Sequence, residues 1–161
     1  MQAHGILGLA LSLVVAGACS RYGQAPAGEV SAASVGERGR WLAAISPPPA
    51  LASSLAVNGW AAMAPDSSRA GTDVTLSLSD VPAGSVPRWS VNRGKCGADE
   101  GVFGPAEAYG PIKVDPSGRA AAAARIPLPT PAGGSYFVSV RTPSAGGEMT
   151  IACGSFAPPG Q

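Results

Sequence analysis

The sequence predicts an all-β fold, a small antiparallel Greek-key-like sandwich or barrel of about seven strands. Apolar and polar residues alternate along residues 74–79 and 136–141, which is typical of strands that turn one face to a core and the other to water. The 161 residues include 22 glycines and 16 prolines, and only 13% are charged. This composition favours short elements joined by turns, so we expect few helices.

The expected strands follow one another at short intervals. They comprise residues 55–64, 74–79, 88–93, 111–114, 119–126, 136–141 and 149–156. Turn-forming residues separate them, as in the Asp-Pro-Ser-Gly sequence at 115–118 and the Ala-Gly-Gly sequence at 145–147. These strands define a β-sandwich domain at residues 55–157, and we expect a disordered tail at residues 158–161.

One expected strand carries conflicting signals. A run of alanines lies between Arg119 and Arg125, and alanine is the best intrinsic helix former. The run is short, however, and follows a turn. It also ends just before Pro127, which disfavours a helical conformation in the residue that precedes it. We therefore favour a strand over a helix here.

The N-terminus resembles a bacterial lipoprotein signal peptide. An apolar run at residues 6–15 is too short to span a bilayer as a helix, and the small residues 16–18 then precede Cys19. We expect residues 1–18 to be removed and Cys19 to carry lipid as the first residue of the mature protein. The first four residues lack Lys and Arg, and Ala16 stands where Leu is more usual. The alternative is an ordinary signal peptide cut after Ala18.

A flexible, lipid-anchored linker is expected at residues 19–54. Ala, Gly, Ser and Pro dominate this segment, which offers too little apolar surface to offset the entropy lost on ordering. Residues 41–45, Trp-Leu-Ala-Ala-Ile, are the exception. We favour a short strand or helical turn that docks loosely on the domain over a partner-binding motif.

The three cysteines fit the lipoprotein interpretation. If Cys19 is lipidated, Cys96 and Cys153 remain, and an exported chain usually pairs its cysteines. A disulfide between them would contribute about 4 kcal/mol on a chain-entropy estimate. That is a large share of the stability of a small domain.

The C-terminal part of the domain resembles chordin-type domains. The resemblance rests on the sequence at residues 136–142, on Gly-Gly-Glu-Met at residues 146–149 and on Gly-Ser-Phe at residues 154–156. Chordin-type domains are small β-sandwiches that are similar to copper/zinc superoxide dismutase. The resemblance implies a sandwich over about residues 55–156, with residues 89–94 where a His-x-His-x-x-Gly-like signature is usual.

The histidines that this resemblance implies are missing. Val91, Asn92 and Arg141 occupy the expected positions, and the only histidine, His4, lies in the signal peptide. A copper or zinc site of the dismutase type needs several imidazoles. We therefore expect no metal and no cofactor.

The loop at residues 97–110 is the expected contact surface. Phe103 and Tyr109 are its candidate exposed contact residues, since binding residues concentrate on loops of rigid scaffolds. Asp99, Glu100 and Glu107 are interpreted as a solvated acidic group rather than as an acid–base pair or a calcium site. An alternative is a ligand or glycan platform made of aromatic residues, but we expect most of these residues in the core instead. The aromatic residues considered are Trp60, Trp89, Phe103, Tyr109 and Tyr136.

These observations favour a non-enzymatic protein. A mature chain without histidine excludes Ser-His-Asp and Cys-His catalysis, and a net charge of +1 does not favour nucleic acid as a partner. We expect a lipid-anchored structural or binding module of the cell envelope, monomeric, with an unknown protein or small-molecule partner. Ser20 in place of Asp after the cysteine favours the outer membrane, on its periplasmic face or at the cell surface. The alternative is a degenerate relative of a copper/zinc superoxide dismutase-like protein with residual metal binding or carboxylate-based activity.

Overall fold

The computed structural model of the protein describes residues 39–160, and this part is an antiparallel β-sandwich, as the sequence predicts. Two 3-10 turns, η1 (Pro49–Leu51) and η2 (Ala106–Ala108), are its helical elements. The strands of this part are β1 (Trp41–Ile45), β2 (Asn58–Pro65), β3 (Thr72–Ser79), β4 (Arg88–Lys95), β5 (Ala98–Val102), β6 (Lys113–Val114), β7 (Ala120–Ile126), β8 (Tyr136–Ser144) and β9 (Gly147–Ser155). Two of these nine strands, β1 and β5, were not among the seven expected from the sequence.

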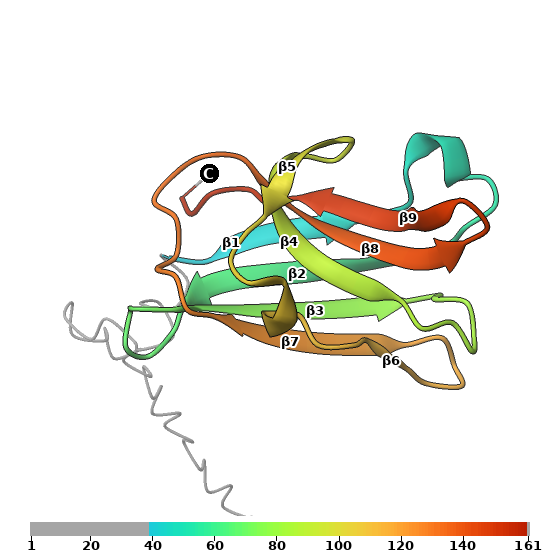
Figure 1. Ribbon diagram of the computed structural model, residues 1–161, viewed down its shortest axis with the longest axis horizontal. Coiled ribbons are helices and arrows are strands. Elements are labelled where there is room, and N and C mark those ends of the chain that lie inside the picture. Colours follow the sequence, from blue (N-terminus) through green and yellow to red (C-terminus); the bar gives the residue numbers. More distant parts are fainter. Residues whose placement is uncertain (1–38, 161) are drawn as a thin grey trace, which may run out of the picture.

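The strands form two layers (Figure 1). One sheet has five strands in the order β1-β2-β3-β7-β6, and the other has four in the order β5-β4-β8-β9. The chain crosses between the sheets after β3, β5 and β7, so that β7 returns beside β3 and β8 returns beside β4. These crossovers give the Greek-key-like order.

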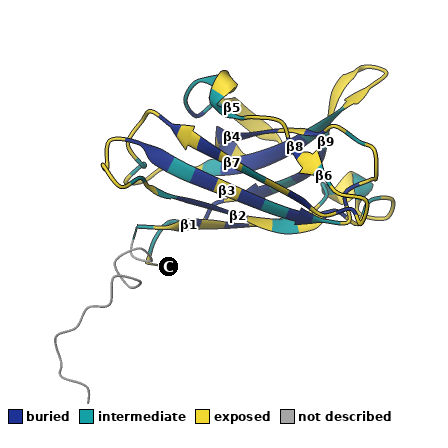
Figure 2. Ribbon diagram, turned by 90° about the horizontal axis from the view of Figure 1, so that it is seen from below, coloured by how far each residue is buried: buried dark blue, intermediate teal, exposed yellow. Residues whose placement is uncertain are grey.

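Period-two alternation determines which side chains form the core. Val74, Leu76 and Leu78 of β3 point inward and are buried, and so are Val138 and Val140 of β8. Figure 2 shows this alternation along β3, whereas β8 is buried on both faces from Phe137 to Val140. The outer face of β8 was expected to lie in water. Phe137 and Ser139 of that face are buried instead, next to the β4–β5 turn and to the prolines at 48 and 49.

The alanine run forms strand β7, as expected. Its residues pair with β3 in antiparallel register, from Leu78 opposite Ala120 to Thr72 opposite Ile126. Ala120, Ala124 and Ile126 are buried. Pairing with a strand that is already half-buried therefore overrides the helix propensity of alanine.

The expected boundary of the domain at residue 55 is wrong, because residues 41–45 are part of the sandwich. They form β1, which pairs with β2 from Trp41 opposite Met63 to Ile45 opposite Gly59. Trp41, Ala43 and Ile45 are buried, so this strand is built into the core rather than loosely docked. Residues 41–54 of the expected linker thus belong to the domain.

Strand β1 also joins the two sheets. Ser46 and Cys153 exchange two backbone hydrogen bonds of 3.1 and 2.9 Å, and Leu42 and Ala157 exchange two of 3.3 and 2.8 Å. At Gly154 a Cβ atom would collide with the carbonyl oxygen of Ala44, so glycine permits this close approach. One side of the sandwich is therefore closed by main-chain hydrogen bonds.

The expected signal peptide at residues 1–18, the lipidation site Cys19 and the linker up to residue 38 lie outside the described residues. Within residues 39–160, no helix is long and apolar enough to cross a membrane.

Candidate functional site

The hairpin of β4 and β5 folds across the outer face of the four-stranded sheet. Two glycines with positive φ shape it, Gly94 at +94° and Gly97 at +87°. A Cβ atom at Gly94 would collide with the carbonyl oxygen of Ala98, so a larger residue does not fit in this turn. The pairing of the two strands shifts register between Asn92 and Gly94, and such a bulge increases the local bend.

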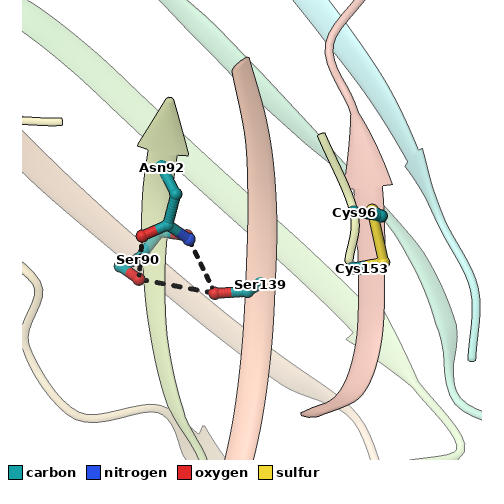
Figure 3. The surroundings of a disulfide bond; sticks show 5 residues. All are labelled: Ser90, Asn92, Cys96, Ser139 and Cys153. Carbon is teal, nitrogen blue, oxygen red and sulfur yellow. Dashed lines mark hydrogen bonds between the residues drawn. A yellow bond between two sulfur atoms is a disulfide. The ribbon is translucent and has the colours of Figure 1, made fainter. Parts of the chain in front are cut away.

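A disulfide between Cys96 and Cys153 fixes the tip of this hairpin to β9, which confirms the expected pairing. The two cysteines are 57 residues apart in the sequence. Since β4, β8 and β9 are adjacent in that order, the hairpin has to span β8 to reach Cys153. The bond therefore ties the tip of the hairpin to β9, at the far edge of the sheet from β5 (Figure 3).

Three polar side chains of β4 and β8 are buried in the same sheet. Asn92 donates through Nδ2 to Ser139 Oγ at 2.8 Å, and its Oδ1 accepts a hydrogen bond from Ser90 Oγ at 3.1 Å. The hydroxyls of Ser90 and Ser139 lie 3.4 Å apart (Figure 3). These groups satisfy one another's hydrogen bonds, which offsets the cost of removing them from water.

Beside this cluster, Arg141 lies between two carboxylates. Its Nη2 donates to Asp99 Oδ2 at 3.2 Å, and its Nη1 lies 4.0 Å from Glu148 Oε2. Arg88 approaches the other oxygen of Glu148 at 3.8 Å. The Arg141 side chain is 27% exposed, and ion pairs that water reaches contribute little to stability. The contact with Asp99 nevertheless links β8 to the β4–β5 hairpin.

Two cavities adjoin Arg141. One of about 370 Å³ lies between the hairpin and the segment before η1, and it is lined by Pro48, Pro49, Phe137, Ser139, Arg141 and Thr150 together with the disulfide. The other has a volume of about 400 Å³ and includes Arg88, Ser90, Tyr109, Arg141 and Glu148. Both volumes are within the range of small-molecule sites. Arg141 is thus the one charged side chain that contributes to both cavities.

Phe103 and Tyr109 do not form the exposed contact surface expected from the sequence. Phe103 is buried, and Tyr109 is half-buried with its hydroxyl donating to the Phe103 carbonyl at 2.6 Å. The Tyr109 ring packs edge-on against Trp89, with 5.2 Å between the ring centres. Burial raises the pKa of Tyr109 above its usual range, so the phenol keeps its proton and its hydrogen bond. Phe103 is thus part of the hydrophobic core, and Tyr109 packs against it.

The acidic residues of the same loop are distributed over its surface. Asp99, Glu100 and Glu107 are all exposed, but Asp99 alone of them pairs with Arg141, and it accepts a hydrogen bond from the Gly101 amide at 2.8 Å. Within residues 39–160, no three His, Cys, Asp or Glu side chains lie close enough together to hold a metal ion. The structure thus brings only Asp99 of the three into the candidate site.

Sequence reasoning missed the residues that form the cavity beside the disulfide. Ser139 and Arg141 are the polar members of an alternating strand, so they were expected to face water. The pairing of Cys96 with Cys153 was the available signal, because it draws the hairpin over β8.

No protein-family model matches this chain. A comparison with curated proteins also finds no similar sequence. The resemblance to chordin-type domains therefore stays a prediction. In the structure, Asn92 and Arg141, which stand where that resemblance implies histidines, belong to the buried polar cluster and to the ion-pair network.

Replacing Asn92 with alanine should destabilise the protein by about 1–3 kcal/mol, because the buried hydroxyls of Ser90 and Ser139 lose their shared partner. Urea denaturation of the two proteins measures this difference. Ser155→Ala is the control, since Ser155 lies on the same cross-strand row through Phe137 but is exposed. Equal stability of the Asn92 and Ser155 variants would contradict a structural role for the cluster.

Proposed function

We propose that this protein is a lipid-anchored, non-enzymatic binding module of the bacterial cell envelope. The Cys96–Cys153 disulfide carries this proposal. Such bonds form and persist in oxidising compartments outside the cytosol. Pairing these two cysteines also leaves Cys19 as the third, at the end of the apolar run at residues 6–15. The disulfide and the lipoprotein-like N-terminus thus point to the same compartment independently.

The chemistry of the candidate site supports binding rather than catalysis. The buried polar side chains of β4 and β8 hydrogen-bond to one another, and Arg141 is neutralised by Asp99 and Glu148. Side chains that are already hydrogen-bonded or ion-paired within the protein shape the surface, but they are not free to transfer a proton to a substrate or to attack it. A partner would contact the rigid cavities beside Arg141, held open by the disulfide and by the prolines at 48 and 49.

Membrane attachment through Cys19 is tested by cell fractionation. The wild-type protein should be found in the membrane fraction and incorporate labelled palmitate, because more than one acyl chain on a cysteine gives stable anchoring. Cys19→Ser should lose the label and leave the membrane fraction. Ser20→Ala is the control and should behave as the wild type. Membrane association of Cys19→Ser equal to that of the wild type would refute the lipid anchor.

A further inference from the structure

Trp60 is an exposed tryptophan on the outer face of the five-stranded sheet. The other two tryptophans of the chain, Trp41 and Trp89, are 1% and 4% exposed, whereas Trp60 is 51% exposed. Its cross-strand neighbours are Ala44 and Ser77, whose short side chains leave much of the indole uncovered. Trp60 therefore presents an open aromatic face on this sheet, against which a ligand ring can stack.

A groove of about 590 Å³ lies beside Trp60. We call it the Trp60 groove. Its polar residues come from β2, β3, β6 and the β6–β7 turn, and they include Asn58, Ser77, Ser79, Lys113, Asp115 and Arg119. The Asn58 amide is held by Ala56, Asp80 and Ser79. A serine hydroxyl both donates and accepts hydrogen bonds, as the hydroxyl groups of a sugar require, and Ser77 presents one in the groove.

The charges of the groove favour an anionic ligand. Neither Lys113 nor Arg119 makes an ion pair within residues 39–160. The carboxylate of Asp115 is used by its own turn, where Oδ1 accepts hydrogen bonds from the Ser117 amide and hydroxyl and from the Arg119 amide. These bonds, the one from the Ser117 side chain foremost, lower the pKa of Asp115. Arg119 also attracts this carboxylate electrostatically. Lys113 and Arg119 nevertheless exceed the single carboxylate that lines the groove by one positive charge.

We propose that the Trp60 groove binds an acidic oligosaccharide. The C–H face of a pyranose ring carries partial positive charge and stacks on the negative face of the Trp60 indole. The Ser77 hydroxyl then hydrogen-bonds to a ring hydroxyl, and Lys113 and Arg119 pair with a carboxylate of the sugar. Nucleic acid is disfavoured, because a polyphosphate binds through many more cations than these two and the net charge of the chain is only +1.

Fluorescence of the full-length protein, purified in detergent, tests this proposal. Trigalacturonic acid is the probe, and the neutral galactose trisaccharide of the same linkage is its matched control. Since Trp41 and Trp89 are buried, a change in emission reports on Trp60. We expect a saturable response to the acidic trisaccharide that weakens as salt is added. The neutral sugar should bind at least about tenfold more weakly.

Variants measure separately how much Trp60 and the two cations of the groove contribute to binding. Binding of trigalacturonic acid, measured by calorimetry, should weaken about tenfold or more in Trp60→Ala and in Lys113→Ala/Arg119→Ala. Leu42→Ala is the control, since Leu42 is exposed on the same face but outside the groove. Unchanged thermal melting establishes that each variant is folded.

Three outcomes would overturn the proposal: no saturable binding of trigalacturonic acid, equal binding of the neutral trisaccharide, or tighter binding of an oligothymidylate. Retained affinity in Trp60→Ala would overturn it as well. None of these results depends on the lipid at Cys19. The oligosaccharide proposal can therefore fail while the proposed membrane anchor holds, and the reverse is also true.

Discussion

Replacing Trp41 with alanine is expected to lower the free energy of unfolding by about 3–5 kcal/mol. The side chain is 1% exposed and packs edge-on against Tyr136, with 5.7 Å between the ring centres. Its Nε1 donates to the Pro131 carbonyl at 3.2 Å, so alanine also removes the partner of that oxygen. Urea denaturation measures the loss.

The matched control is the next residue of the same strand. Leu42 is exposed on the outer face, so Leu42→Ala should change stability by less than about 0.5 kcal/mol. If Trp41→Ala were equally mild, β1 would be a loosely docked segment, as the sequence suggested, and the sandwich would not depend on it.

Removing the disulfide is expected to cost about 4 kcal/mol, because the open chain regains the entropy that closing a loop of this length removes from the unfolded state. The Cys96→Ser/Cys153→Ser variant tests this by urea denaturation, with the reductant-treated wild type for comparison. The bond also fixes the tip of the hairpin whose strand β4 carries Ser90 and Asn92. Hydrogen exchange of the β5 amides should therefore become faster in the variant.

Cys19→Ser is the control for this pair, since it removes a cysteine outside the disulfide. Its stability should equal that of the wild type. A double variant as stable as the wild type, with unchanged exchange in β5, would mean that strand pairing alone holds the hairpin.

Most of the strands are predictable from the sequence because they alternate. Val74, Leu76 and Leu78 specify both the strand and its inward face. In β5 the residues are Ala-Asp-Glu-Gly-Val, which carry no such alternation. This strand forms because the hairpin and the disulfide bring it to the edge of β4. Such long-range constraints are not visible in a local pattern.

The wrong predictions for Trp60, Phe103 and Tyr109 have local reasons. Around Trp60, residues of both faces of β2 are apolar, so alternation cannot tell which face is inward, and the structure places Ala61 and Met63 in the core. Phe103 and Tyr109 lie in a glycine-containing loop, where exposure was the simplest expectation. They are buried because the loop packs against the core, a position that only the assembled sheets define.

The intact mass of the protein purified from membranes, with and without reductant and alkylating agent, tests the proposed anchored and oxidised module most directly. We expect the mass of a chain that begins at Cys19 and carries a diacylglyceryl group. The thiols of Cys96 and Cys153 should be alkylated only after reduction. An unlipidated chain, or thiols at Cys96 and Cys153 that react before reduction, would contradict it.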